Sequence, residues 1–132
     1  MAYKAKLPDG RDWPLDLSDT ALKNVRERRG RAHLRQLLEH VEDTLSKPDF
    51  VYDGIRKNEG WKGPLWGDSE GMCWCKRVGF YIGDDDKAVA FKDSMSFVIF
   101  VNGKNRIFGW EYIHCQDSGE PLGASYRFGP KL

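Results

Sequence analysis

The chain has 132 residues, a size typical of one domain, and 40% of them are hydrophobic and 13% aromatic. That composition excludes an intrinsically disordered chain and predicts a single hydrophobic core. Twenty-one Lys and Arg residues against twenty Asp and Glu residues give a formal net charge of +1, so the overall charge selects neither nucleic acid nor a membrane as a partner.

The N-terminus lacks the apolar core of a secretory signal, and no apolar run approaches the ~20 residues that a membrane helix needs. We therefore expect a soluble cytoplasmic protein without membrane contact. The three cysteines are an odd number, which without an export signal predicts reduced thiols rather than a disulfide framework.

Residues 1–17 are predicted to form an N-terminal arm, irregular or with one short strand. Prolines, a glycine and alternating charges interrupt this segment, and its apolar residues could dock on the body of the domain: Trp13, Leu15 and Leu17. A helical part follows over residues 18–47. Ser18 is a suitable N-cap, Asp19 suits the positive end of the helix dipole, and Gly30 is expected to interrupt or end the first helix.

The second helix is predicted from the spacing of its apolar residues, which form one stripe: Leu34, Leu37, Leu38, Val41 and Leu45. We expect all five to be buried against the sheet. Because Pro48 disfavours helical geometry at Lys47, the helix should end near Ser46. The glycine-rich residues 51–71 then predict a long ordered loop with room for one short strand, and loops of that length are often functional.

Residues 72–132 are predicted to form an antiparallel sheet. Strands are expected over residues 72–82, 96–101, 106–114 and 124–128, with a turn at residues 83–86. The apolar run at residues 96–101 suits a central strand covered on both faces, and Asn102-Gly103 suits a tight turn with positive φ. The predicted fold is therefore α+β, with N-terminal helices packed on one face of an antiparallel sheet of three to five strands.

A local positive charge stands out in this neutral chain. Six cations accompany a single acid, Glu27, over thirteen residues: Lys23, Arg26, Arg28, Arg29, Arg31 and Arg35. Arginine guanidinium groups bind phosphate oxygens in a bidentate manner, so this junction is a candidate cradle for a nucleic-acid backbone. A solvated helix face is the alternative interpretation of the same run.

Histidine is the side chain best matched to proton transfer near neutral pH. His33 should lie at the edge of the core, whereas His40 is expected on an exposed or flanking face. Strict alternation along residues 107–114 would place Phe108, Trp110, Tyr112 and His114 on one face and Ile107, Gly109, Glu111 and Ile113 on the other. Each histidine could be structural or catalytic.

A metal site is the third candidate. Cys73, Cys75, His114 and Cys115 are zinc ligand types, but Cys-x-Cys is not the usual knuckle, and adjacent strand residues point to opposite faces. We expect no metal and no cofactor. Trp61, Trp66, Trp74 and Trp110 could stack on bases, although Trp74 and Trp110 are expected in the core.

The opening of the helical part carries a family resemblance. Leu17-Ser18, Ala21-Leu22, Val25 and Arg28-Arg29, followed by an amphipathic helix and residues 45–52, resemble phage-associated domains of the barnase, EndoU, colicin and RelE-like ribonuclease superfamily. The order of helices before an antiparallel sheet is similar too. The family pattern places histidines where this chain has Asn24 and Arg29, so either the enzyme has diverged or the scaffold has lost its chemistry.

The resemblance implies a metal-independent ribonuclease or toxin-like endoribonuclease, with RNA and a cognate protein inhibitor as candidate partners. Attack of a ribose 2′-OH on the adjacent phosphate needs a proton acceptor, a proton donor and cations. Candidate phosphate-binding residues are Arg28, Arg29, Arg31, Lys76 and Arg127. Candidate catalytic residues are His33 or His114 for proton transfer, Ser125 on the last strand, and Glu111 as a reserve base. The competing hypothesis is a non-catalytic interaction or accessory protein that binds RNA or a protein partner.

Overall fold

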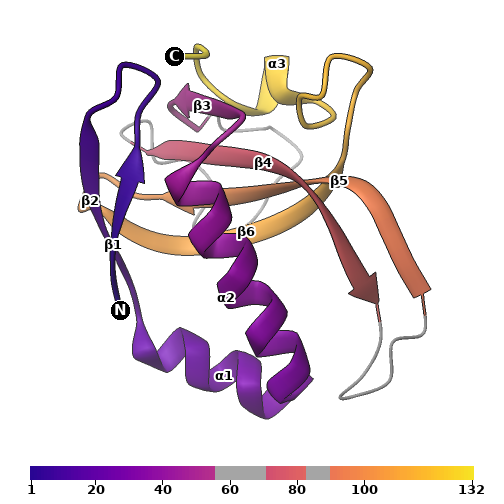
Figure 1. Cartoon of the computed structure of the whole chain (residues 1–132). Coiled ribbons are helices and arrows are strands. Elements are labelled where there is room, and N and C mark those ends of the chain that lie inside the picture. Colours follow the sequence, from indigo (N-terminus) through magenta and orange to yellow (C-terminus); the bar gives the residue numbers. More distant parts are fainter. Residues whose placement is uncertain (56–70, 83–89) are drawn as a thin grey trace.

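The computed structural model describes residues 1–55, 71–82 and 90–132. The elements are β1 (Ala2–Lys6), β2 (Asp12–Leu17), α1 (Asp19–Arg29), α2 (Arg31–Ser46), β3 (Phe50–Asp53), β4 (Met72–Ile82), β5 (Ala90–Val101), β6 (Arg106–His114) and α3 (Ala124–Arg127). The predicted α+β class is confirmed (Figure 1). The strand count was too low, because the described residues form a six-stranded mixed sheet of order β1-β2-β6-β5-β4-β3.

The N-terminal segment is a β-hairpin of two strands where the sequence predicted an irregular arm or one short strand, and Leu15 and Leu17 are buried in the core as expected. β1 and β2 pair from Ala2↔Asp16 to Lys6↔Asp12, and alternate residues such as Ala5 and Leu15 enter the core. Pro14 is compatible with the hairpin because odd-numbered residues of β2 bond to β1, so the N–H that proline lacks would point to the other side. On that side β2 pairs with β6 only at Asp16 and Leu17, and this pairing is parallel.

The strand β5 runs through the middle of the sheet, as its sequence predicted. Met95–Val101 are all buried, and their side chains alternate between two clusters. Phe97, Ile99 and Val101 lie on the face that α1 and α2 cover, here called the helix face. Val98 and Phe100 lie on the back face together with residues of α3 and the C-terminal segment. Both faces of the central strand are therefore covered.

The alternation predicted for β6 is interrupted by an irregularity in its pairing with β5. Phe100 pairs with Gly109, whereas the adjacent Val101 pairs with Ile107, so the register shifts there. As a result Ile107 packs on the helix face with Trp110, and Phe108 packs on the back face. The strict alternation that grouped Phe108 with Trp110 was wrong, because the irregularity moves one residue to the other face.

The β5–β6 turn lies where the sequence predicted it, but a different residue has the positive φ. Among the described non-glycine residues the positive φ belongs to Asn105, at 60°, rather than to Asn102-Gly103. The Oδ1 of Asn102 accepts from the backbone N–H groups of Lys104 and Arg106 and so closes the turn. Asparagine tolerates the left-handed conformation better than most residues, which accounts for the choice of Asn105.

The expected last strand is instead the short helix α3. The N–H groups of Arg127 and Phe128 donate to the carbonyls of Gly123 and Ala124, which closes a helical turn. Only single bridges then join the chain end to the β3 region, at Tyr52↔Lys131 and Ile55↔Phe128. The loop predicted after β3, with Trp61 and Trp66, and the turn at residues 83–86 lie outside the described residues.

Candidate functional site

The corner between α1 and α2 is built by a cap and a glycine. The Oγ of Ser18 accepts from the N–H of Ala21, as predicted, and starts α1. Gly30 has φ of 90° and ends α1 by donating its N–H to the carbonyl of Arg26. Because that backbone geometry favours glycine, the chain turns at this residue and α2 starts at Arg31. α2 ends at Ser46, where the sequence predicted.

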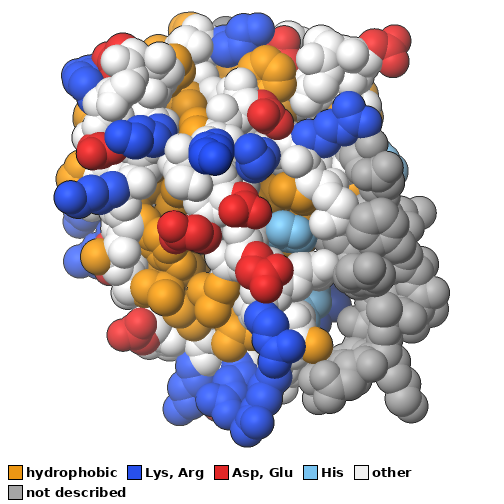
Figure 2. All heavy atoms as spheres, viewed as in Figure 1, with side chains coloured by type: hydrophobic (Ala, Val, Ile, Leu, Met, Phe, Trp, Pro, Cys, Tyr) orange, Lys and Arg blue, Asp and Glu red, His pale blue; other side chains and the backbone are white. Residues whose placement is uncertain are grey.

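The turn gathers basic side chains on both sides of Gly30. We call this surface the arginine corner, and its members are Arg26, Arg28, Arg29, Arg31 and Arg35. All five are exposed, and within the described part of the chain none has an acidic partner at ion-pair distance. Figure 2 shows the basic side chains together at the lower end of the molecule, with hydrophobic side chains exposed just above them. The corner is a local positive surface on a nearly neutral protein.

An open groove of about 440 Å³ lies in this corner. It is lined by Arg26, Arg31 and Arg35 together with Leu34 and Leu38. These two leucines are only half-buried, so the expectation that the whole stripe of α2 is buried was wrong for them. The stripe is wider than the contact with the sheet, which takes Leu37, Val41 and Leu45. The lining of the groove therefore combines two apolar side chains with three cationic ones.

His33 is the sequence-predicted proton carrier that lies in this region. Its side chain is half-buried, and burial together with the charge of Arg29 lowers its pKa below the usual value. The ring is therefore neutral at neutral pH and can accept a proton. Asn24, where the family pattern has a histidine, is exposed on α1.

Lys76 does not join the arginine corner. Its Nζ donates a 2.7 Å hydrogen bond to the carbonyl of Lys47, at the C-terminal end of α2. The corner lies at the opposite end of this helix, whose 16 residues span about 24 Å. The lysine thus stabilises the end of α2, where a cation is favourable.

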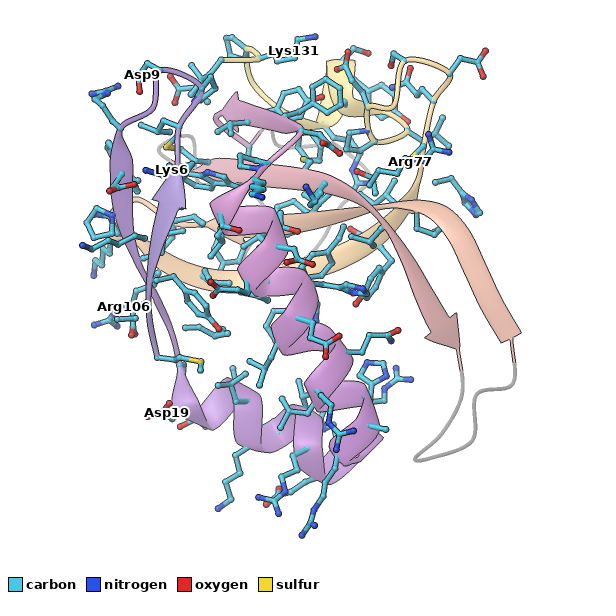
Figure 3. All side chains as sticks on the ribbon, viewed as in Figure 1. Lys6, Asp9, Asp19, Arg77, Arg106 and Lys131 are labelled. Carbon is cyan, nitrogen blue, oxygen red and sulfur yellow. The ribbon has the colours of Figure 1, made fainter. Side chains whose placement is uncertain are left out.

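Glu111, Ser125 and Arg127 form a separate group on the other side of the sheet. Arg127 of α3 donates to Glu111 of β6 at 2.9 Å, and the arginine side chain is 19% exposed. Ser125 is exposed on α3, which packs on the back face through Ala124. Figure 1 shows α3 and α1 at opposite ends of the molecule, and in Figure 3 Lys131 and Asp19 mark the same two ends. The sheet separates this group from the arginine corner.

His114 is also remote from the corner. It is exposed at the end of β6, opposite Met95 of β5, and its carbonyl accepts from the N–H of Leu122. The candidates for phosphate binding and for acid–base chemistry are therefore distributed over four places, and among the acid–base candidates only His33 accompanies the arginines.

His40 is buried, whereas the sequence analysis placed it on an exposed or flanking face. The side chain is 8% exposed, with Nε2 3.2 Å from the carbonyl of Gly79 and Nδ1 2.7 Å from the Tyr112 hydroxyl. Since a carbonyl only accepts, Nε2 carries the proton and Nδ1 of the neutral ring accepts from Tyr112. Burial lowers the pKa of His40, outweighing the opposing effects of Gly79, Asp43 and Glu39. No local pattern marks this site, because Gly79 and Tyr112 are distant in sequence.

The cysteines do not gather with enough other ligand types among the described residues to form a metal site. Cys73 and Cys75 are fully buried in the back-face cluster, and burial raises the pKa of both thiols well above the ordinary value. Cys115 lies in an isolated bridge with Pro121. Among the described residues no three His, Cys, Asp or Glu side chains are grouped in a way that could hold a metal ion. Trp74 is fully buried and Trp110 partly so, as expected for core residues.

No helix within the described ranges is both long and apolar enough to cross a membrane. Comparisons with protein-family models, with curated proteins and with solved structures found no match to this chain.

Proposed function

We propose that this chain is an interaction module that binds an anionic macromolecule through the arginine corner. The observation that carries the proposal is the exposure of five arginines at one helix corner, without acidic partners among the described residues; three of them, Arg26, Arg31 and Arg35, line the groove. Guanidinium groups left in this way are available for carboxylate or phosphate groups, which they bind with two parallel hydrogen bonds. Keeping five like charges together opposes folding, so a partner that neutralises them relieves that repulsion.

A second candidate is cleavage of RNA at the same corner, in line with the resemblance to the ribonuclease superfamily. It is supported by His33, whose lowered pKa and proximity to Arg29 suit a general base beside a phosphate. This mechanism still needs a proton donor for the leaving oxygen. Glu111, Ser125 and His114 lie on other elements away from the corner, which is why binding without catalysis is the leading proposal.

The binding proposal is tested with a single-stranded RNA of about 20 nucleotides as a polyanion probe, titrated at increasing salt. We expect measurable affinity at low salt, and a salt slope reduced by about 1 to 2 units of log K per log salt in Arg28→Ala plus Arg29→Ala. The matched control is Lys104→Ala plus Arg106→Ala, which removes the same charge from the exposed β5–β6 turn region. The proposal would be rejected if both double variants lost RNA affinity and salt dependence equally, or if the unchanged protein did not bind RNA at low salt.

Catalysis is tested separately by incubating the RNA with the protein and a chelator. Intact RNA is the result expected of a binding module. Cleavage that disappears in His33→Ala and persists in His114→Ala would establish the ribonuclease candidate at the arginine corner.

A further inference from the structure

We infer that the groove of the arginine corner binds an acidic amphipathic α-helix of a partner protein. The inference rests on the proposed function and names the partner for the same surface. It starts from the composition of the groove, which is lined by the apolar side chains of Leu34 and Leu38 and by the cationic side chains of Arg26, Arg31 and Arg35. Both kinds of side chain have to be matched by the occupant.

The groove residues of α2 form two parallel rows. Arg31 and Arg35 are four residues apart, and so are Leu34 and Leu38, which gives each row a repeat of about 6 Å along the helix axis. A partner α-helix offers the same repeat in its own rows of residues four apart. A row of aliphatic side chains beside a row of carboxylates would meet both rows of α2 at once. This is the geometry by which amphipathic helices occupy apolar grooves.

The two leucines that line the groove favour a helical protein partner over a nucleic acid. A phosphate backbone matches the arginines but has nothing apolar to place on Leu34 and Leu38, and the alternative, an unpaired base, is usually held by aromatic side chains. Among the described residues, those that line the groove include no aromatic side chain. Aliphatic side chains from a partner helix would bury the remaining exposed surface of these two leucines and add hydrophobic stabilisation that the isolated chain lacks.

The size of the groove agrees with this occupant. At about 440 Å³ it lies toward the small end of the ~300 to 1,000 Å³ that ligand pockets span. It has room for a few aliphatic side chains, while the rest of the partner helix would lie over the arginines. The bidentate arginine–carboxylate pairs would then form the rim around an apolar centre.

The test uses two synthetic peptides of about 15 residues with identical composition, rich in Glu and Leu. In one peptide the leucines share a helical face beside the glutamates, and in the other they are scattered around the helix. We expect the patterned peptide to bind the intact protein at least about tenfold more tightly than the scattered one. Leu34→Ala plus Leu38→Ala should remove that advantage while leaving the affinity for the RNA probe within about twofold.

Two further variants keep the test decisive. Leu34→Met plus Leu38→Met retains apolar volume and should retain the preference for the patterned peptide, whereas Arg31→Ala plus Arg35→Ala should weaken binding of both the peptide and the RNA. Equal affinities for the two peptides would overturn the helix inference. It would also be overturned if Leu34→Ala plus Leu38→Ala weakened RNA binding as much as peptide binding, because a nucleic acid would then contact the two leucines. Binding of RNA without the peptides leaves the proposed function standing, and failure of all three probes rejects both.

Discussion

The indole Nε1 of Trp74 donates a 2.8 Å hydrogen bond to the backbone carbonyl of Lys6, which joins β4 to β1. Three strands lie between these two in the sheet order, so the sheet must curl for them to meet. The hydrogen bonds between β1 and β2 are made by odd-numbered residues: the Leu7 N–H donates to the Arg11 carbonyl, and Met1 and Leu17 each donate to the other's carbonyl. The backbone groups of the even-numbered residues of β1, including Lys6, therefore point away from β2. Trp74 therefore satisfies a carbonyl of the edge strand, and α2 packs within the curve against β1, β4 and β5.

We expect Trp74→Phe to lower the free energy of unfolding by about 1 to 3 kcal/mol beyond the effect of lost volume, because the Lys6 carbonyl loses its buried donor. Urea denaturation followed by circular dichroism measures the loss. Trp110→Phe is the control, since the Trp110 indole has no hydrogen-bond partner among the described residues. Equal destabilisation by the two variants would contradict the role given to this bond.

Leu37→Ala should cost about 2 to 5 kcal/mol of stability, because this side chain is 1% exposed in the helix-face cluster. Leu38→Ala should cost clearly less, since Leu38 is half-buried in the lining of the open groove. The comparison by chemical denaturation tests where the stripe of α2 leaves the core. A larger loss of unfolding free energy in Leu38→Ala than in Leu37→Ala would contradict the burial of Leu37 in the core.

His40 should make the protein less stable as pH falls below about 6.5. Because burial lowers its pKa in the folded state, the unfolded chain binds the proton first, and stability is lost between the unfolded pKa and the lower folded pKa. His40→Gln should flatten this part of the unfolding free energy profile. His33→Gln removes the other histidine with a lowered pKa and serves as the comparison. An unchanged profile in His40→Gln would show that protonation of this ring is not coupled to folding.

Gly129→Ala should destabilise the protein strongly, because a Cβ at this position would overlap the carbonyl oxygen of Asp53. The N–H of Gly129 donates to Gly54 and that of Leu132 to Val51, so a shift here would open the contact between the chain end and the β3 region. Gly109→Ala, where a Cβ would make an ordinary contact with Phe100, is the matched control. Thermal unfolding compares the two, and similar melting temperatures would contradict the close packing at Gly129.

Local signals identified most of the helical part. The Ser18 cap, the break at Gly30 and the end of α2 at Ser46 each depend on interactions within a few residues, so sequence chemistry sufficed. The central position of β5 could likewise be predicted from its continuous apolar run.

Features that depend on contacts between residues far apart in the chain could not be predicted from the sequence. β1 and β2 resemble an irregular arm until the parallel pairing with Ile107 and the Trp74 bond to Lys6 are known. His40 was misplaced because its burial depends on Tyr112 and Gly79. The arginine run was visible in the sequence. The groove and its two lining leucines could not be predicted, because they depend on how α1 and α2 are oriented relative to each other. The sequence also could not reveal that Ser125 and the arginines lie on opposite sides of the sheet.

The parallel pairing of β2 with β6 has a consequence for biosynthesis. Asp16 and Leu17 find their partners at Arg106 and Ile107, about ninety residues later in the chain. During translation the N-terminal hairpin and the helices therefore emerge well before the strand that fixes the hairpin in the sheet. Until residues 105–107 emerge from the ribosome, this edge of β2 has no strand to pair with, so the six-stranded sheet is completed only late in synthesis.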